Sequence, residues 1–329
     1  MQVIDVHSHF YPKAYLSILE KRNTWPIMSF DEKGRTIIVD RRGRIVTITE
    51  PMFNLEMRIR DMERLGVSMQ CLSLSAPWTY FAKPEEEVKI AKMVNDEIAR
   101  AVEKYPDRFI GLATLPLSDI DMAIEEAKRA IKDLGLKGII MGTNINGETL
   151  DSPRLRPVFE VISSLKVPIL LHPATPLCVE YMSEYRLAPM VGFPFETTMA
   201  VARLIFSGIL SRLDTLSIIA VHGGGAIPYL AGRMEICYKA YPECREHIND
   251  QPMKYLTMIY YDTVLYSLPA LKCLYETVGS RRMLFGSDYP HVIGDPLWVK
   301  KTINELKASD EEKQAILREN ASKLFNVQL

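Results

Sequence analysis

Short apolar segments alternate with longer amphipathic segments along the whole of this 329-residue chain. Most of the apolar segments are continuous rather than alternating in polarity, as expected of parallel strands that are covered on both faces. Eight such strands are predicted, at residues 3–6, 69–74, 109–113, 137–141, 167–171, 216–221, 257–261 and 282–285. Eight strands that each lead into a helix indicate a (β/α)8 barrel, the TIM-barrel fold, whereas a doubly wound sheet would leave exposed edges.

The segments between the strands have the spacing of amphipathic helices. In residues 85–103, for example, Val88, Ala91, Val94 and Ile98 recur at intervals of three or four. The other predicted helices cover residues 120–134, 153–165, 196–210, 227–241, 268–278 and 297–306, and a last helix covers residues 310–324. The barrel is therefore expected to end in an additional C-terminal helix.

One segment, residues 20–50, departs from this alternation. Residues 36–39 and 44–49 have strand character and flank a glycine-containing turn at residues 40–43, which predicts a β-hairpin inserted after the first strand. We expect the hairpin to form a flap over the mouth of a distorted barrel. No linker or repeat divides the chain, so residues 1–329 are predicted to form a single barrel domain.

The bulk composition excludes several classes of protein. A net charge of -1 without a basic stripe gives no reason to expect nucleic acid or a membrane surface as a partner. Five cysteines without a C-x-x-C pair favour reduced, mostly buried thiols over a disulfide framework. The first residues lack the features of a signal peptide, and no apolar run approaches the length of a membrane span. The cytoplasm is the expected compartment.

Polar residues gather where particular strands end. His7 and His9 close the first strand, His172 the fifth, His222 the sixth and Asp288 the eighth. Active sites of (β/α)8 barrels lie at the C-terminal ends of the strands, so these five side chains are expected at one rim. Four of the six histidines of the chain are in this group.

Four of these residues have the chemistry of a metal site. The two histidines of the His-x-His pattern share one face of a strand, so that both rings can reach the same point. Neutral imidazole and carboxylate groups are ordinary ligands of zinc and similar divalent ions. An isolated His-x-His is more often a packing feature, but its combination with His172 and Asp288 predicts a mononuclear site with room for a water molecule.

His222 is expected to play a different part, because three glycines follow it. Gly223, Gly224 and Gly225 would let the backbone approach a ligand and would leave N–H groups open to an anionic substrate. His222 is then either a further ligand or a proton shuttle, and we favour the shuttle because four other ligands complete the site. The fourth strand ends without a lysine, so a carbamylated lysine that bridges two metals is not expected there.

Three further residues are candidate substrate contacts. His291 lies close to Asp288 in the sequence, Tyr80 follows the second strand and Asn144 follows the fourth. Each has an ordinary structural alternative, since His291 could be a plain loop residue and aromatic side chains such as Tyr80 more often serve packing.

With these residues in place, the sequence resembles the amidohydrolase-related family of the amidohydrolase superfamily, and within it the aminocarboxymuconate-semialdehyde decarboxylase group. The resemblance covers nearly the whole chain. It rests on residues 5–9 (DVHSH), 105–116 (YPDRFIGLATLP), 172–173 (HP), 192–198 (GFPFETT), 222–225 (HGGG) and 286–290 (GSDYP).

The resemblance implies a distorted barrel, usually a homodimer, with one divalent metal and no organic cofactor. The metal is commonly zinc, with manganese or another divalent ion as the alternative, and the residues that match its ligands are His7, His9, His172 and Asp288. His222 matches the histidine that handles protons. The resemblance also implies release of CO2, without oxidation, from an aromatic or muconate-type acid, the carbon that bears the carboxylate being protonated.

Two positions depart from the decarboxylase pattern. That enzyme holds the carboxylates of its substrate with two arginines, one from the inserted hairpin and one from a partner subunit. The matching positions here hold Val46 and Tyr241, while Arg44 and Arg233 lie near them. The exact substrate therefore stays open, and cationic groups in the pocket wall would indicate an acid.

Three functions are consistent with these residues. The first is a carbon–carbon lyase, a metal-dependent decarboxylase of a small aromatic or muconate-type carboxylic acid, in which His222 and Asp288 are the catalytic residues. The second is a hydrolase that directs a metal-bound hydroxide at an ester, lactone, amide or C–C bond. The third is a metal-binding barrel without catalytic activity, against which His222 beside an open coordination position argues.

Overall fold

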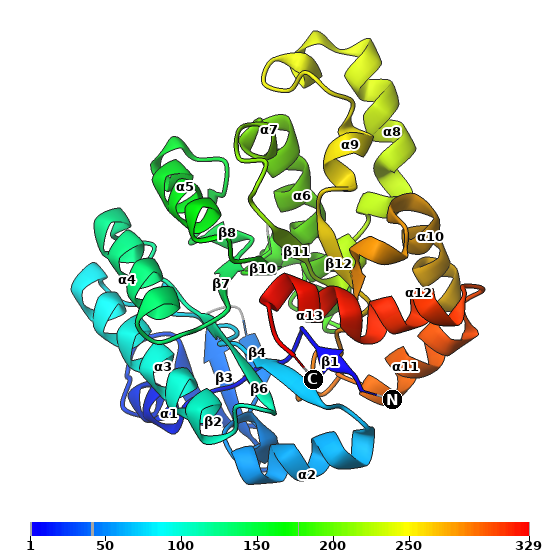
Figure 1. Ribbon diagram of the computed structural model, residues 1–329. Helices are drawn as coiled ribbons and strands as arrows, with labels where there is room; N and C mark the ends of the chain where they lie inside the picture. The colour runs from blue at the N-terminus through cyan, green and yellow to red at the C-terminus, as the bar shows by residue number, and fades with distance from the viewer. Residues whose placement is uncertain (1, 41–42, 177, 329) are drawn as a thin grey trace.

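The computed structural model describes residues 2–40, 43–176 and 178–328, and eight parallel strands form its centre (Figure 1). Every predicted barrel strand is present within one to three residues of its expected bounds. In their order around the sheet, the strands are β1 (Ile4–Asp5), β5 (Met69–Leu72), β6 (Phe109–Ala113), β7 (Gly138–Gly142), β10 (Ile169–His172), β11 (Ile218–Ala220), β12 (Tyr260–Asp262) and β13 (Met283–Leu284).

The first and last strands meet along a seam, by which we mean residues 6–9 and 285–289. The other neighbouring strands pair in regular parallel ladders, whereas Ser8 and Tyr289 form an isolated parallel bridge. Main-chain hydrogen bonds close the seam, among them Val6 N to Phe285 O at 2.9 Å and Asp288 N to His7 O at 2.8 Å. The eight strands thus form a nearly closed barrel, which confirms the predicted fold class.

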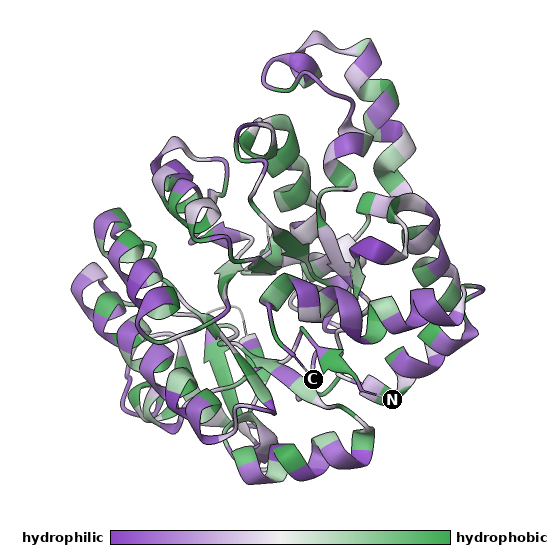
Figure 2. Cartoon of the chain, in the orientation of Figure 1, coloured by the Kyte–Doolittle hydropathy of each residue, from purple (hydrophilic) through white to green (hydrophobic). Residues whose placement is uncertain are grey.

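Helices surround these strands, and Figure 2 shows the strands as the more hydrophobic layer. Residues of the central strands are buried on both faces, which explains why their sequences are continuous apolar runs. The outer helices include α3 (Pro84–Lys104), α4 (Ile120–Lys132), α5 (Arg156–Leu165), α6 (Phe193–Phe206), α8 (Ile227–Ala240), α10 (Leu268–Val278) and α11 (Pro296–Glu305).

Two predicted helices are interrupted. The segment at residues 196–210 divides into α6 and α7 (Ile209–Arg212), because Gly208 has a φ of 74° and closely approaches the main chain of His247. The C-terminal segment consists of α12 (Asp310–Gln314), a π-helical turn and α13 (Asn320–Phe325). Three α-helices of the described residues were missing from the prediction, namely α1 (Lys13–Glu20), α2 (Leu55–Leu65) and the short α9 (Pro252–Leu256).

The segment inserted after β1 forms an antiparallel sheet with one strand more than predicted. It consists of β2 (Ile27–Phe30), β3 (Thr36–Asp40) and β4 (Gly43–Thr47). Residues 41 and 42 of the predicted turn lie outside the described residues. The additional strand arises because each of the extended residues 27–30 pairs with a residue of β3.

None of the helices among the described residues is long and apolar enough to cross a membrane. The five cysteines are free, as expected, but only Cys71 is buried, and Cys178 is exposed. The expectation of mostly buried thiols was therefore wrong, because Cys237, Cys244 and Cys273 lie on the outer faces of surface helices and turns, where they are only partly covered.

Candidate metal centre

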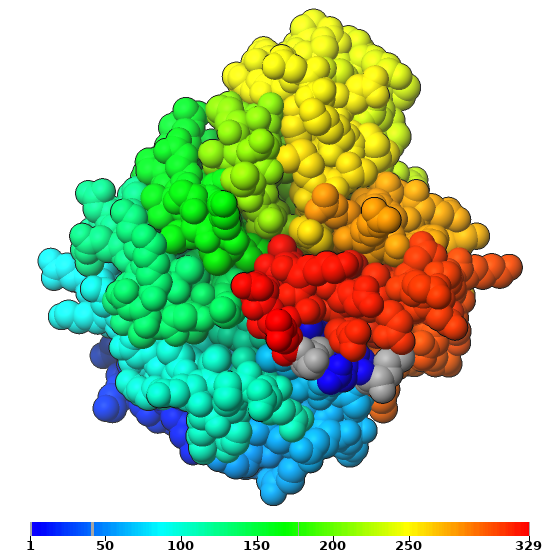
Figure 3. Space-filling view, in the orientation of Figure 1, coloured from blue at the N-terminus to red at the C-terminus, as the bar shows by residue number. Residues whose placement is uncertain are grey.

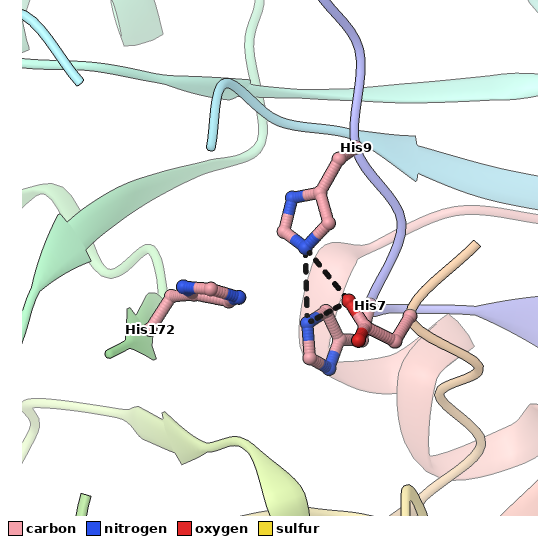
Figure 4. A group of neighbouring side chains, drawn as sticks. His7, His9 and His172 are labelled. Atoms are coloured by element: carbon pink, nitrogen blue, oxygen red, sulfur yellow. Dashed lines mark hydrogen bonds and ion pairs between the residues drawn. The ribbon is translucent and has the colours of Figure 1, made fainter. Parts of the chain in front are cut away.

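Four side chains from three strands converge at the C-terminal end of the barrel. Each of His7, His9, His172 and Asp288 offers one ligand atom, and these atoms all lie within 4.8 Å of one another. The rings of the three histidines face a common space (Figure 4). All four residues are buried, with exposed fractions of at most 4%. The structure thus brings together the four residues that the sequence predicted as metal ligands.

Hydrogen bonds to Nδ1 determine which nitrogen of each ring faces this space. His7 Nδ1 is 2.6 Å from Asp262 Oδ2. Burial favours the protonated form of Asp262, but the contact with His7 outweighs it and lowers the pKa of the carboxyl group. An ionised carboxylate can only accept, so His7 Nδ1 carries a hydrogen, and Nε2 points toward the other ligands. Burial lowers the pKa of His7, but the hydrogen bond with Asp262 and the charge of Asp288 outweigh it and raise the pKa.

The same reasoning applies to the other two rings. Ser73 Oγ donates to Ser8 O at 2.8 Å and therefore accepts from His9 Nδ1 at 3.2 Å. His172 Nδ1 lies 3.1 Å from the carbonyl oxygen of Pro173, which can only accept. Burial lowers the pKa of His9 to about 3 and that of His172 well below its usual range, so both rings are neutral. All three histidines consequently direct Nε2 toward the common space, and the neutral rings of His9 and His172 present a lone pair there.

The arrangement of these atoms fits a cation. His7 Nε2 is 3.1 Å from His9 Nε2, and Asp288 Oδ1 lies 3.4 and 3.2 Å from these two atoms. Ligand atoms around a tetrahedral zinc ion are about 3.3 Å apart. Asp288 Oδ1 is also a buried oxygen without a hydrogen-bond partner among the described residues. Electron pairs crowded in this way repel one another unless a positive charge lies between them.

His222 lies beside this group but is not part of it. Its ring centroid is 5.3 Å from that of His7 and 5.8 Å from that of His172. His222 Nδ1 is buried without a hydrogen-bond partner among the described residues, and burial lowers the pKa of the ring. His222 and Asp288 both have positive φ angles, 54° and 62°. Such backbone strain is concentrated at functional sites, where the surrounding structure holds it.

The glycines after His222 serve packing rather than anion binding. Gly223 N donates to Asp262 Oδ1 at 2.9 Å, and Gly224 and Gly225 donate to main-chain oxygens. A Cβ atom on Gly225 would lie 2.0 Å from Pro194 O. The expectation that these N–H groups are open to an anionic substrate was therefore wrong, because the turn satisfies them internally.

Asp262 is a site residue that the sequence reasoning missed. It ends β12, is fully buried, and its two oxygens accept hydrogen bonds from the His7 ring and from two main-chain N–H groups. A signal was available, since Asp262 is an acidic residue directly after the seventh apolar strand. It stands in the same position relative to its strand as His172 and His222, but the reasoning was not applied to the seventh strand.

A cavity of about 1090 Å3 lies next to the metal-ligand group, although none of the four ligand residues lines it. Trp78 and Phe193 line it and also contact the His172 ring, with centroid distances of 5.6 and 6.4 Å. Tyr80 and Asn144 also line the cavity, and His291 lies with its ring centroid 4.8 Å from that of His9. The three candidate substrate contacts thus lie around the site.

Two of these three candidate substrate contacts already form hydrogen bonds within the protein. Tyr80 Oη accepts from Gly142 N at 3.2 Å, and the Asn144 amide donates to Glu196 Oε2 at 2.8 Å and to Thr175 O at 3.0 Å. The inserted sheet contributes Asp40, Gly43, Arg44 and Ile45 to the cavity wall. Val46 is buried, whereas Tyr241 is exposed at the end of α8.

Comparisons with known proteins agree with this geometry. The family model described as "Amidohydrolase" matches residues 4–327. A 2-amino-3-carboxymuconate-6-semialdehyde decarboxylase of Dictyostelium discoideum is 33% identical over 97% of this chain and 90% of its own length. A gamma-resorcylate decarboxylase of Rhodococcus jostii is 30% identical over 83% and 87%. The crystal structure of the Metarhizium anisopliae protein IDCase superposes with a TM-score of 0.89 at 27% identity, covering 99% and 97% of the two chains.

Proposed function

The chain belongs to the amidohydrolase family, and on that premise we propose that it is a metal-dependent carboxy-lyase. Its substrate would be a small aromatic or muconate-type carboxylic acid, from which it releases CO2 without oxidation. The observation that carries the proposal is the convergence of three histidine Nε2 atoms and the Asp288 carboxylate beside a cavity, whose wall residue Trp78 contacts the His172 ring. The relatives with the same overall architecture include decarboxylases of both kinds of acid.

His7, His9, His172 and Asp288 would hold one divalent metal ion. A bound divalent ion supplies positive charge that polarises an oxygen of the substrate or of a water molecule. Asp262 fixes the His7 ring through Nδ1, and Ser73 fixes that of His9, so little reorganisation is needed before binding. We propose zinc as the resident metal, because three imidazoles and one carboxylate are ligands that suit it.

His222 would deliver the proton in the chemical step. A proton on the His222 ring moves to the carbon that bears the carboxylate, the C–C bond to the carboxylate breaks, and its electron pair returns to the unsaturated system as CO2 leaves. The step needs no oxidant. Burial lowers the pKa of His222, so the ring is neutral until it takes up a proton, and the protonated ring is then a stronger acid than ordinary imidazolium.

The cavity wall suits a planar acid. Trp78, Tyr80 and Phe193 provide aromatic surface beside the metal-ligand group. Arg44 and Arg186 lie in the same wall, and Arg186 Nη1 donates to Arg44 O at 3.2 Å. Guanidinium groups in a cavity attract a negatively charged ligand, although Asp40 and Glu180 line the same cavity and Arg44 also pairs with Asp31 at 3.2 Å. We propose the cytoplasm as the compartment of the enzyme.

The proposal is tested by following CO2 release from hydroxybenzoates and muconate analogues, with the metal content measured on the same preparation. We expect release from at least one of these acids, loss of activity on chelation, and recovery when Zn²⁺ or Mn²⁺ is added back. Turnover of esters or lactones without CO2 would instead support the hydrolase. Metal-free protein with undiminished CO2 release would refute the metal-dependent mechanism.

We also propose that the enzyme is a homodimer, joined through an apolar surface on α6, α8 and the π-helical turn before α6. The large exposed side chains of this surface are Met190, Phe195, Met199, Tyr229 and Ile236, with exposed fractions from 48 to 82%. Apolar surface on this scale is typical of an interaction site. The part of the chain around α8 and α9 (Pro252–Leu256) projects from the body, which makes it accessible (Figure 3).

Light scattering is expected to give a molar mass twice the 37.5 kDa of one chain. Ile236→Glu should shift the protein toward the monomer, because a charge in an apolar interface is costly to bury. Phe30→Glu is the matched control, since Phe30 is an apolar residue with an exposed fraction of 72% on the inserted sheet. A monomeric wild-type protein, or equal effects of the two variants, would contradict this interface.

A further inference from the structure

We infer that α2 acts as a clamp across the barrel seam and sets the spacing of the metal ligands on its two sides. The clamp consists of Arg58 and Asp61 on α2 and Tyr289 beyond β13. The inference rests on the proposed metal site and assigns positioning roles to three residues that lie outside the ligand set. Arg58 and Asp61 are three positions apart and share one face of the helix.

Arg58 holds the side of the seam that carries His7 and His9. Its guanidinium group is fully buried and donates to four oxygen atoms. The acceptors are the main-chain oxygen of His9, Ser8 Oγ at 3.2 Å, Gln70 Oε1 at 3.2 Å and Pro51 O at 3.1 Å. All four acceptor atoms are uncharged. The Arg58 guanidinium therefore holds polar atoms around the His-x-His segment in place. Burial lowers the pKa of Arg58 to about 10, which leaves it charged at neutral pH.

Asp61 holds the other side of the seam through Tyr289, the residue directly after Asp288. Tyr289 Oη donates to Asp61 Oδ2 at 2.8 Å. The Tyr289 ring also lies against the Arg58 guanidinium, 5.1 Å from its centroid, so one helix contacts both sides. The two sides are joined to each other by His9 N, which donates to Tyr289 O at 2.8 Å.

The position of this clamp matters because the seam separates two of the ligands from a third. His7 and His9 lie on one side and Asp288 on the other, and an isolated bridge rather than a ladder joins them. A shift of the two sides would change the distances of 3.2 and 3.4 Å between Asp288 Oδ1 and the two Nε2 atoms. Metal affinity is sensitive to such outer contacts, which typically contribute a factor of about 10 to 100.

Tyr289→Phe is the sharpest test, since it removes one hydroxyl group and keeps the ring that lies against Arg58. The affinity for Zn²⁺ and for Mn²⁺ is measured by competition with a fluorescent chelator, and the melting temperature of the metal-free protein is measured in parallel. We expect the affinity to fall by about 10- to 100-fold. Tyr275→Phe is the matched control, because Tyr275 Oη donates to Glu312 Oε1 at 2.8 Å far from the site.

Asp61 supplies a second, graded test. Asp61→Ala removes the acceptor and should weaken metal binding as much as Tyr289→Phe does, while Asp61→Asn keeps an acceptor oxygen and should restore most of the affinity. The double variant Asp61→Ala/Tyr289→Phe should be no weaker than either single variant, since both remove the same contact.

The outcomes separate this inference from the metal site itself. If the wild-type protein binds neither ion, the proposed function fails. If it binds metal and Tyr289→Phe binds equally well, only the clamp fails. A melting temperature that falls much further in metal-free Tyr289→Phe than in Tyr275→Phe would make the contact a general structural one and would also overturn the inference.

Discussion

Asp288→Ala is expected to reduce the affinity for a divalent ion by more than about 100-fold and to abolish turnover. Asp288 is the anionic member of the ligand group, and the other three members are imidazoles. Removal of a direct ligand should lower the metal affinity by more than the factor of about 10 to 100 that is typical of removing an outer contact. The effect is measured by chelator competition and by the metal content of the purified variant.

Thermal unfolding gives an independent measurement of the same loss. A ligand at a free concentration 100 times its Kd stabilises the folded state by about 2.7 kcal/mol. Wild-type protein should therefore melt at a higher temperature when Zn²⁺ or Mn²⁺ is added, and Asp288→Ala should not respond. Asp107→Ala is the control, because Asp107 is an exposed carboxylate. An Asp288→Ala variant that binds metal normally would show that the four-ligand site is wrong.

His222→Asn is expected to lower kcat by a factor of about 100 to 10,000, the usual contribution of a positioned acid or base. Metal affinity should stay close to that of the wild-type protein, because His222 lies outside the group of four ligands. The combination of bound metal and lost turnover is what separates a proton-transfer residue from a ligand. Steady-state CO2 release and metal analysis of the same sample measure both.

His247→Asn is the matched control for this variant, since the His247 side chain has an exposed fraction of 58%. It should retain full activity. If His222→Asn lost its metal, His222 would be a further ligand. If the variant kept both its metal and its turnover, the proton would have to come from another group.

The main features of the site could be predicted from sequence because they depend on local patterns. Each apolar run marks a strand, and a polar residue at its end is placed on the rim by the geometry of the barrel. That reasoning found His7, His9, His172 and Asp288. It missed Asp262, although this residue also ends a strand, because Asp262 holds the His7 ring and lies outside the group of four ligands for which the pattern was searched.

Helix α2 was missed for a different physical reason. Its sequence, LEMRIRDMERL, is strongly polar, and a buried arginine occupies a position where the helical pattern would lead one to expect an apolar residue. Only the folded structure shows that Arg58 is surrounded by oxygen atoms from distant parts of the chain. The hydrogen bonds of Gly223 and Ala226 after His222 were equally invisible, because Asp262 and Thr198 accept them from other elements.

The barrel seam has a consequence for how the protein is made. It joins residues from nearly opposite ends of the chain, as shown by Ser287 Oγ, which donates to Asp5 Oδ2 at 2.5 Å across 282 positions. Contacts of such long sequence separation form late, and the amino-terminal part of a nascent chain emerges first. His7 and His9 therefore leave the ribosome well before Asp288 is synthesised. Translation products that stop before the eighth strand would carry the histidine pair but could complete neither the barrel nor the metal centre.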